Sequence, residues 1–148
     1  MNSMSHLLLV EDNQDDYEAV VRSLKKNHFM NPVKWCKNGQ DALDYIYKNN
    51  AYNDNTDASL PDLILLDLNM PGIDGRHVLQ QLKSDKNTRS IPVVVLTTSN
   101  DAKDIEKCYD LGASTYIQKP VDFEGLTQAI RTMKDYWFGV AILPRKDL

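Results

Sequence analysis

Short apolar runs recur along this chain at nearly even intervals, and this recurrence restricts the folds open to it more than any other feature. Each run has the length of a β-strand and is too short for a buried helix. The five runs span residues 7–10, 33–36, 63–66, 93–96 and 116–117. The third and fourth are apolar at every position, which is typical of central strands in a parallel sheet that is covered on both faces.

Apolar residues at helical spacing follow every one of these runs. Val20 and Leu24 follow the first run, and Ile130 and Met133 belong to a longer stripe after the fifth. Residues three or four positions apart lie on one face of a helix. A strand–helix unit repeated five times needs crossover helices on both faces of the sheet and right-handed connections. The sequence therefore predicts a doubly wound, three-layer α/β fold with a five-stranded parallel sheet.

Composition and charge fit one globular domain that does not act on nucleic acid. The 148 residues are 42% hydrophobic and 26% charged, which is average for a folded protein and excludes a wholly disordered chain. Lys and Arg number 17 against 21 Asp and Glu, and the resulting net charge of −4 would repel a phosphate backbone. We therefore expect no nucleic-acid partner.

Neither the N-terminus nor the cysteines point to export, a membrane or a zinc site. The apolar run at 7–10 ends at once in Glu11 and Asp12, so it is neither a signal peptide nor a membrane span. Cys36 and Cys108 lie far apart and share no metal-binding spacing. We therefore expect a cytoplasmic protein without a membrane partner.

Polar residues stand directly after four of the five apolar runs, which is where doubly wound folds bind their ligands. The carboxyl ends of parallel strands meet at one edge of the sheet, so these residues are expected to gather there. They are Glu11 and Asp12 after the first run, Asp67 and Asn69 after the third, Thr97, Thr98 and Ser99 after the fourth, and Lys119 after the fifth.

The acidic members of this group need a cation. Glu11 and Asp12 taken alone could be solvated acids at the start of a helix, but Asp67 follows an apolar run in which an unpartnered carboxylate is costly. Carboxylates that share one site repel one another unless a cation compensates their charge. Oxygen ligands suit Mg²⁺, which keeps several waters and often binds a phosphate at the same time.

The motifs around these residues resemble the receiver domain of two-component response regulators, over residues 5–134. The segments that carry the resemblance are residues 8–13, residues 61–71 with Asp74 and Gly75, residues 92–97 and residues 112–120. The resemblance implies a flavodoxin-like (βα)5 receiver fold. A polar insert at 49–60 and a C-terminal extension at 135–148 look like the single-domain regulators that serve cyanobacterial phytochromes.

The resemblance implies a phosphoacceptor and a metal site. Asp67 would accept a phosphoryl group from a phosphohistidine of a partner histidine kinase, and the narrower likeness points to a bacterial phytochrome as that kinase. Mg²⁺ would be bound by the side chains of Asp12 and Asp67, by the backbone carbonyl of Asn69 and, through water, by Glu11. Such a chain is a signalling phosphoacceptor rather than an enzyme, because it assists only its own phosphorylation and dephosphorylation.

The resemblance also implies a switch. Lys119 and Thr97 would each contact a phosphoryl oxygen, and Tyr116 would turn inward when Thr97 moves. The bond between Lys119 and Pro120 is cis in the family. Thr98 departs from the family pattern, in which a smaller residue often follows the switch threonine, and we expect its bulk to slow the loss of phosphate.

Three other functions remain to be weighed. The first is a receiver-fold interaction module that has kept the fold without the chemistry. The second is an FMN carrier, which would need a phosphate-binding loop where this chain has Glu11, Asp12 and two further acids. The third is a phosphatase of the haloacid dehalogenase type, which needs a second Asp two positions after its nucleophile, where Asn69 stands.

The residues after 134 suggest how the signal leaves the domain. They are too few for an attached DNA-binding domain, so we expect output through a protein surface. The extension is rich in apolar residues, and these either form a partner or self-association surface or fold back on the domain. They are Trp137, Phe138, Val140, Ile142 and Leu143. We expect a homodimer formed by the fourth and fifth helices, the fifth strand and this extension.

Overall fold

Short strands alternate with amphipathic helices in the computed structural model, which describes residues 5–53 and 59–144. The strands are β1 (Leu7–Val10), β2 (Val33–Cys36), β3 (Leu63–Leu66), β4 (Val93–Thr97) and β5 (Thr115–Gln118). The helices are α1 (Gln14–Lys26), α2 (Gly39–Tyr47), α3 (Gly75–Ser84), α4 (Ala102–Asp110) and α5 (Phe123–Lys134). The five predicted strand–helix units are confirmed.

The strands form one parallel sheet in the order β2-β1-β3-β4-β5. Strand β1 pairs on both sides, so that Val10 lies opposite Cys36 of β2 and opposite Leu66 of β3. The chain adds β2 on one side of β1 and then β3, β4 and β5 on the other. The switch point of this doubly wound sheet therefore lies between the carboxyl ends of β1 and β3, where such folds bind ligands.

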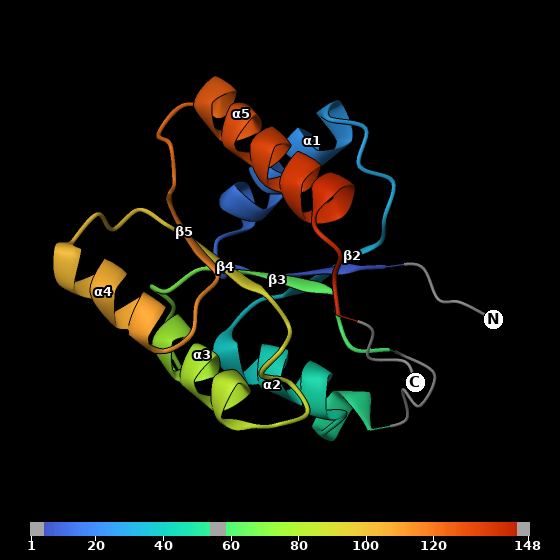
Figure 1. Cartoon of the computed structure of the whole chain (residues 1–148), viewed down its shortest axis with the longest axis vertical. Coiled ribbons are helices and arrows are strands. Elements are labelled where there is room, and N and C mark those ends of the chain that lie inside the picture. The colour runs from blue at the N-terminus through green and yellow to red at the C-terminus, as the bar shows by residue number, and fades with distance from the viewer. Residues whose placement is uncertain (1–4, 54–58, 145–148) are drawn as a thin grey trace.

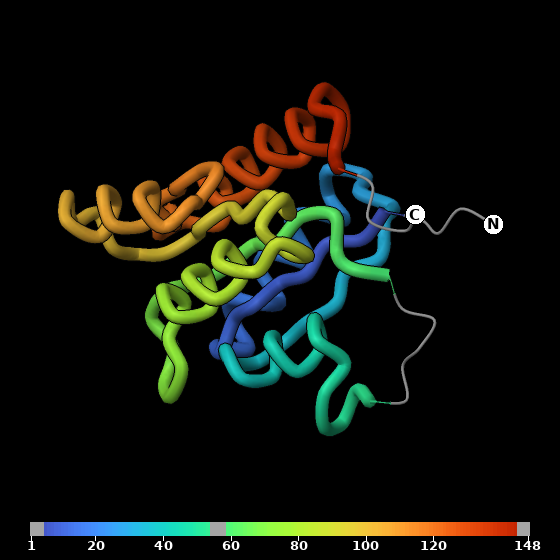
Figure 2. The backbone as a smooth tube through the Cα atoms, turned by 60° about the horizontal axis from the view of Figure 1, so that its bottom comes forward, coloured from blue at the N-terminus to red at the C-terminus, as the bar shows by residue number. Residues whose placement is uncertain are grey.

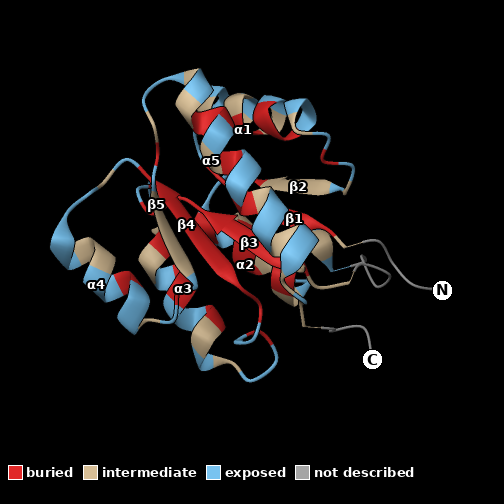
Figure 3. Cartoon of the chain, turned by 45° about the horizontal axis from the view of Figure 1, so that its top comes forward, coloured by how far each residue is buried: buried red, intermediate tan, exposed pale blue. Residues whose placement is uncertain are grey.

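Helices cover both faces of the sheet, as Figure 1 shows, with α1 and α5 on one face and α2, α3 and α4 on the other. Successive strand residues point to opposite faces. Leu8 and Val10 accordingly belong to the core beneath α2 and α3, whereas Leu7 and Leu9 belong to the core beneath α1 and α5. Strands β1, β3 and β4 are buried throughout (Figure 3), which explains why their sequences are almost entirely apolar.

The loops that leave the strands end in helix caps. The side chains of Asn13, Asn38, Asp74 and Asp101 each accept a backbone N–H from the first turn of α1, α2, α3 and α4 respectively. Gly75 begins α3 at a point where a Cβ atom would overlap the backbone carbonyl of Asp67. A glycine at this position therefore lets α3 start directly against the residue that follows β3.

The C-terminal extension continues α5 as a π-helix, η2 (Asp135–Val140), and the two form one coil in Figure 2. Trp137 and Phe138 pack against the core beneath α1 and α5, and the ring of Phe138 meets that of Phe29 edge to face at 5.0 Å. Val140 and Ile142 point into solvent, with 72% and 99% of their surface exposed. Trp137 and Phe138 thus fold back on the domain, whereas Val140 and Ile142 remain exposed, as a partner or self-association surface would require.

The predicted insert at 49–60 lies partly outside the described residues. Its described beginning forms a 3-10 turn, η1 (Asn50–Tyr52), and the Tyr52 hydroxyl donates to Asp41 of α2 at 2.8 Å. This short turn docks the start of the insert on α2. None of the helices in the described part of the chain has the length and hydropathy to cross a membrane.

Candidate functional site

Three carboxylates meet at the switch point of the sheet. Glu11 and Asp12 follow β1, Asp67 follows β3, and one oxygen of each lies within 4.8 Å of one oxygen of the others. Pairing of the two strands brings them together, because the backbone N–H of Asp67 donates to the carbonyl of Val10 at 3.0 Å. The structure thus joins acids that are more than fifty positions apart in sequence.

Burial sets the electrostatics of this cluster. Glu11 is 2% exposed and Asp67 is 8% exposed, whereas Asp12 faces solvent. Burial raises the pKa of Glu11 to about 7, and the charge of Asp67 adds to the rise, although a hydrogen bond from Lys119 opposes it. The side-chain oxygen of Glu11 also accepts the backbone N–H of Asn13 at 3.3 Å. A cation at this position would relieve the repulsion among the three carboxylates.

Lys119 enters the cluster from the end of β5. Its Nζ lies 2.9 Å from Oε1 of Glu11 and 3.1 Å from Oδ2 of Asp16 in the first turn of α1. Burial by itself would lower the pKa of Lys119, but the hydrogen bond and the charge of Glu11, together with Asp67, hold that pKa above its ordinary value. The ammonium is therefore a buried positive charge beside the carboxylates.

Asp16 was not among the predicted site residues. Its position in the first turn of a helix is the ordinary place for an acid that favours the helix dipole. Because that local role accounts for the acid, no ion pair was expected from the sequence with Lys119, which lies 103 positions further along the chain. The acidic start of α1 is the one sequence signal that could have suggested it.

Asn69 and Thr97 lie on the other side of Asp67. The backbone N–H of Asn69 donates to Oδ1 of Asp67 at 3.4 Å, and its side-chain amide donates to the Thr97 hydroxyl at 3.3 Å. Thr97 ends β4 and is completely buried. Two hydrogen bonds thus connect Asp67 through Asn69, both in the loop after β3, to Thr97 at the end of β4.

A second series of hydrogen bonds begins at Ser99, two residues after Thr97. The Tyr116 hydroxyl donates to the backbone carbonyl of Ser99 at 2.9 Å, and the Ser99 hydroxyl donates to Asp104 of α4 at 2.9 Å. Arg76 of α3 donates to the same carboxylate at 2.8 Å and 3.2 Å. The hydrogen bond from Arg76, followed by that from Ser99, lowers the pKa of Asp104. The loop after β4 is therefore tied to β5, α4 and α3, and the parts played by Arg76 and Asp104 were not predicted.

The bond between Lys119 and Pro120 does not match the expectation. The described residues contain no cis peptide bond, so this bond is trans in the structure. The backbone N–H of Lys119 donates to the carbonyl of Thr97 at 2.6 Å, which continues the pairing of β4 with β5. Thr98, the departure from the family pattern, directly follows Thr97 and is exposed.

The donor set fits a hard divalent cation. The carboxylates of Glu11, Asp12 and Asp67 supply only oxygen atoms, and the backbone carbonyl of Asn69 is a fourth oxygen close in sequence. Magnesium-like cations prefer such ligands and keep part of their water shell. Because Asp12 is exposed, the cluster is open to solvent on one side.

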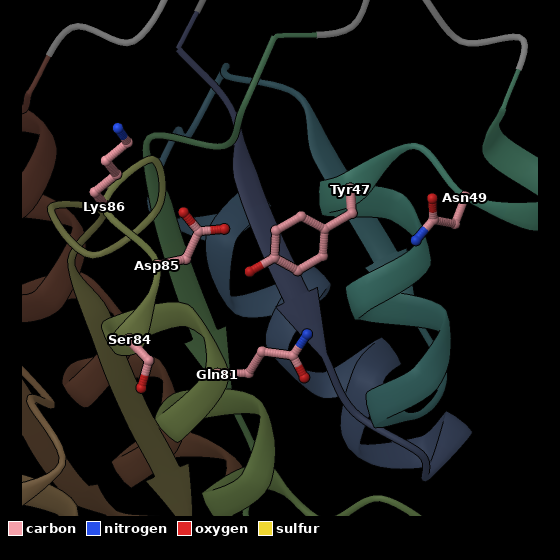
Figure 4. Close-up of a pocket in the computed structure, with 6 residues that line it drawn as sticks. All are labelled: Tyr47, Asn49, Gln81, Ser84, Asp85 and Lys86. Carbon is pink, nitrogen blue, oxygen red and sulfur yellow. The ribbon is translucent and has the colours of Figure 1, made fainter.

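A pocket of about 770 Å³ lies apart from this cluster, at the C-terminal ends of α2 and α3. Figure 4 shows the ring of Tyr47 reaching from α2 toward the end of α3. The lining residues are Tyr47, Asn49, Gln81, Ser84, Asp85 and Lys86. Helices in this fold run back toward the amino ends of the strands, so the pocket lies at the opposite edge of the sheet. None of the predicted site residues lines it.

Comparison with known proteins agrees with this geometry. The family model for the response regulator receiver domain matches residues 7–131. The chain is 38% identical to the probable methanogenesis regulatory protein FilR2 of Methanothrix harundinacea, across 90% of this chain and 83% of that protein. It is 33% identical to the response regulator Rcp1 of Synechocystis, across 93% of this chain and 92% of Rcp1.

Two solved structures extend the comparison. The phosphorylated cyanobacterial phytochrome response regulator RcpA has a TM-score of 0.89 and 38% identity, with 97% of this chain and 100% of that chain covered. The Mn²⁺-bound form of Rcp1 has a TM-score of 0.88 and 32% identity, with 95% of this chain and 99% of that chain covered. The likeness therefore spans the whole described fold and includes one relative with a bound divalent metal and one that is phosphorylated.

Proposed function

The chain belongs to the response regulator receiver family, and on that premise we propose that Asp67 accepts a phosphoryl group from the phosphohistidine of a partner histidine kinase. The observation that carries this proposal is the buried Asp67 carboxylate within 4.8 Å of two further acids at the switch point. In the transfer, a carboxylate oxygen of Asp67 forms the new O–P bond as the N–P bond breaks, and the electron pair of that bond stays on the imidazole.

We propose Mg²⁺ as the resident cation. The side chains of Asp12 and Asp67 would hold it, together with the backbone carbonyl of Asn69 and, through water, Glu11. When bound, such an ion neutralises the charge on the phosphoryl oxygens. The oxygen-only donor set and the exposure of Asp12 support this assignment.

Lys119 and Thr97 supply the remaining contacts in this proposal. Lys119 is already a buried cation, so its Nζ can bind a phosphoryl oxygen without first having to be desolvated. Phosphorylation adds a group with a charge of about −1.5 to −2 next to Asn69 and Thr97. The Thr97 hydroxyl, which now accepts a hydrogen bond from Asn69, would instead donate to that group.

The switch follows from this change in the hydrogen bond of Thr97. Movement of Thr97 would displace Ser99, whose carbonyl accepts the hydrogen bond of Tyr116. Release of that bond would let the Tyr116 ring, which is only half-buried, turn inward against the core beneath α3 and α4. The surface of α4 and β5 then changes, and this change is the proposed output.

Residues 5–134 form the receiver domain in this proposal, and residues 135–148 form an extension that contributes to a homodimer. The proposed interface combines α4, β5 and α5 with the extension. Support comes from the exposed apolar side chains Tyr109 of α4, Tyr136, Val140 and Ile142. Light scattering over a concentration series is expected to show a dimer, and charged substitutions at Val140 and Ile142 are expected to shift it toward the monomer.

We propose that the partner kinase is a bacterial phytochrome and that the phosphoryl transfer takes place in the cytoplasm. The first proposal rests on the likeness to RcpA, which is described as a cyanobacterial phytochrome response regulator. The second is supported by Cys36 and Cys108, which are both buried free thiols and suit a reducing compartment. Phosphotransfer profiling against a panel of histidine kinases, with phytochromes included, tests the assignment of the kinase.

The phosphoacceptor is tested by labelling with acetyl phosphate. The parent is expected to be labelled only when Mg²⁺ is present, and Asp67→Asn is expected to lose the label. Asp110→Asn is the matched control, because Asp110 is exposed at the end of α4 and lies outside the cluster. A parent that takes no label would support a receiver-fold interaction module instead, and a label that persists in Asp67→Asn would place the phosphoacceptor elsewhere.

A further inference from the structure

The indole of Trp35 reaches the metal-ligand loop from the edge strand β2. Its Nε1–H donates to the backbone carbonyl of Glu11, and the two atoms are 2.7 Å apart. Trp35 pairs in register with Leu9, two residues before Glu11. The side chain therefore runs along the sheet toward the carboxyl ends of the strands and ends beside the first two acids.

Strand β2 holds the backbone of Glu11 on both sides. The Glu11 N–H donates to the carbonyl of Cys36 at 3.1 Å, and the Glu11 carbonyl accepts the indole N–H of Trp35. A carbonyl and the amide that follows it lie in one rigid plane. The bond from Trp35 therefore fixes the plane of the peptide that joins Glu11 to Asp12.

The orientation of the Asp12 side chain depends on that peptide plane. Among the described residues, the Asp12 carboxylate has no hydrogen bond or ion pair, and it lies on the exposed side of the cluster. Its backbone is thus all that aims it at Asp67. On the other side of Asp12, the N–H of Asn13 donates to the Glu11 carboxylate at 3.3 Å, so the loop is restrained at both ends.

Other contacts hold the indole itself in place. Its ring stacks on Tyr17 of α1, with centroids 3.8 Å apart and planes 9° from parallel, and Nζ of Lys37 lies 5.1 Å from the ring centroid. Tyr17 directly follows Asp16, the second partner of Lys119. The Trp35 and Tyr17 pair therefore contacts both the Glu11 carbonyl and the first turn of α1.

We propose that Trp35 is a positioning residue for the divalent-metal site and acts through the Glu11 carbonyl to aim the carboxylate of Asp12. This inference rests on the proposed function, because it requires a metal at the cluster. Partners that orient metal ligands from outside typically contribute about 10-fold to 100-fold in metal affinity. A tryptophan that only fills space between β2 and α1 would contribute nothing to that affinity.

Trp35→Phe tests the proposal, because it keeps an aromatic ring beside Tyr17 and removes only the N–H donor and part of the indole. Isothermal titration of Mg²⁺ into the purified chain is expected to show a dissociation constant about 10-fold higher than that of the parent. Labelling by acetyl phosphate is expected to need correspondingly more Mg²⁺ but to reach the parent's rate at saturating Mg²⁺. Trp137→Phe is the matched control, since it makes the same change in the C-terminal extension and should leave Mg²⁺ binding unchanged.

The same control supplies a second measurement that does not depend on whether Trp35→Phe folds. In Trp137→Phe, Trp35 is the only tryptophan, and its emission is expected to change during a Mg²⁺ titration with the midpoint found by calorimetry. An emission that stays constant while the metal binds would count against the proposal.

The outcomes distinguish a failure of the proposed function from a failure of the role proposed for Trp35. A parent that binds no Mg²⁺ would overturn the proposed function. A parent that binds Mg²⁺, together with a folded Trp35→Phe that binds it equally well, would overturn the role of Trp35 alone. A higher dissociation constant with an unchanged saturating rate supports positioning rather than direct participation in the transfer.

Discussion

The ammonium of Lys119 lies 2.9 Å from Oε1 of Glu11, and this ion pair joins the end of β5 to the end of β1 beside the carboxylates of Asp12 and Asp67. The two side chains are 8% and 3% exposed. Removing one partner of such a pair leaves an uncompensated buried charge, whereas removing both is often nearly neutral. The pair therefore contributes to stability as well as to the proposed chemistry.

Lys119→Met is expected to lower the free energy of unfolding by about 3 kcal/mol at pH 8 without metal. The reason is that Glu11 and Asp67 then face each other without the cation. Urea unfolding measures the loss, and the double variant with Glu11→Gln should recover most of it. Asp16→Asn serves as the control, because Asp16 is 43% exposed and its bond to Lys119 is worth under about 1 kcal/mol. Additive losses in the double variant would contradict this account.

The contact between Arg76 and Asp104 restrains the loop after β4. Asp104→Asn should weaken both this ion pair and the bond from Ser99, at a cost of about 1 kcal/mol because both side chains are 27% exposed. We expect faster amide hydrogen exchange at residues 98–101, measured by mass spectrometry, with the rest of the sheet unaffected. Tyr116→Phe should accelerate exchange in the same loop. If exchange is unchanged in both variants, the loop is held by other contacts.

His6 makes stability depend on pH at the other edge of the sheet. Burial lowers the pKa of His6 below its ordinary value of 6.5, although the charge of Asp62 partly opposes the shift. The unfolded chain therefore takes up a proton before the folded chain does, and stability falls as the pH drops through 6.5. Urea unfolding at pH 7.5 and 5.5 should show that His6→Gln loses less stability than the parent over this interval. His77→Gln, a change at an exposed position of α3, should behave like the parent.

Thr98→Ala should shorten the lifetime of the phosphorylated form. Thr98 is exposed and directly follows Thr97, and we expect its side chain to limit the approach of water to the proposed phosphoryl group. A faster loss by a factor of about 3 to 10 corresponds to a barrier lower by about 1 kcal/mol. The decay of acetyl phosphate label after removal of the donor provides the measurement. A variant that loses phosphate no faster than the parent would exclude this role for Thr98.

The two kinds of apolar residue in the extension should respond differently to truncation. Phe138→Ala removes the contact with Phe29 and should lower the free energy of unfolding by about 2 kcal/mol. Ile142→Ala should leave monomer stability unchanged, because Ile142 is 99% exposed, and should weaken the proposed dimer. Thermal unfolding and light scattering distinguish the two effects. Equal losses of stability in both variants would mean that Ile142 also packs on its own domain.

Much of the fold could be predicted because local pattern and tertiary environment agree. The run at 63–66 is apolar throughout since β3 lies at the centre of the sheet with helices on both faces. The gathering of Glu11, Asp12 and Asp67 could also be predicted, because parallel strands must bring their carboxyl ends to one edge. The bond before Pro120, by contrast, was expected to be cis from the resemblance alone, and it is trans in the structure.

Local residue patterns are enough to give the order of strands and helices along the chain and the type of residue at each strand end. The partner of Lys119 in α1, the contact of Trp35 with the Glu11 carbonyl, and the packing of Phe138 on the core while Ile142 stays exposed are visible only in the tertiary structure. Periodicity in a sequence shows only which face of an element is apolar. Contacts between side chains of different elements depend also on register, helix rotation and rotamer, which are set only when the layers pack.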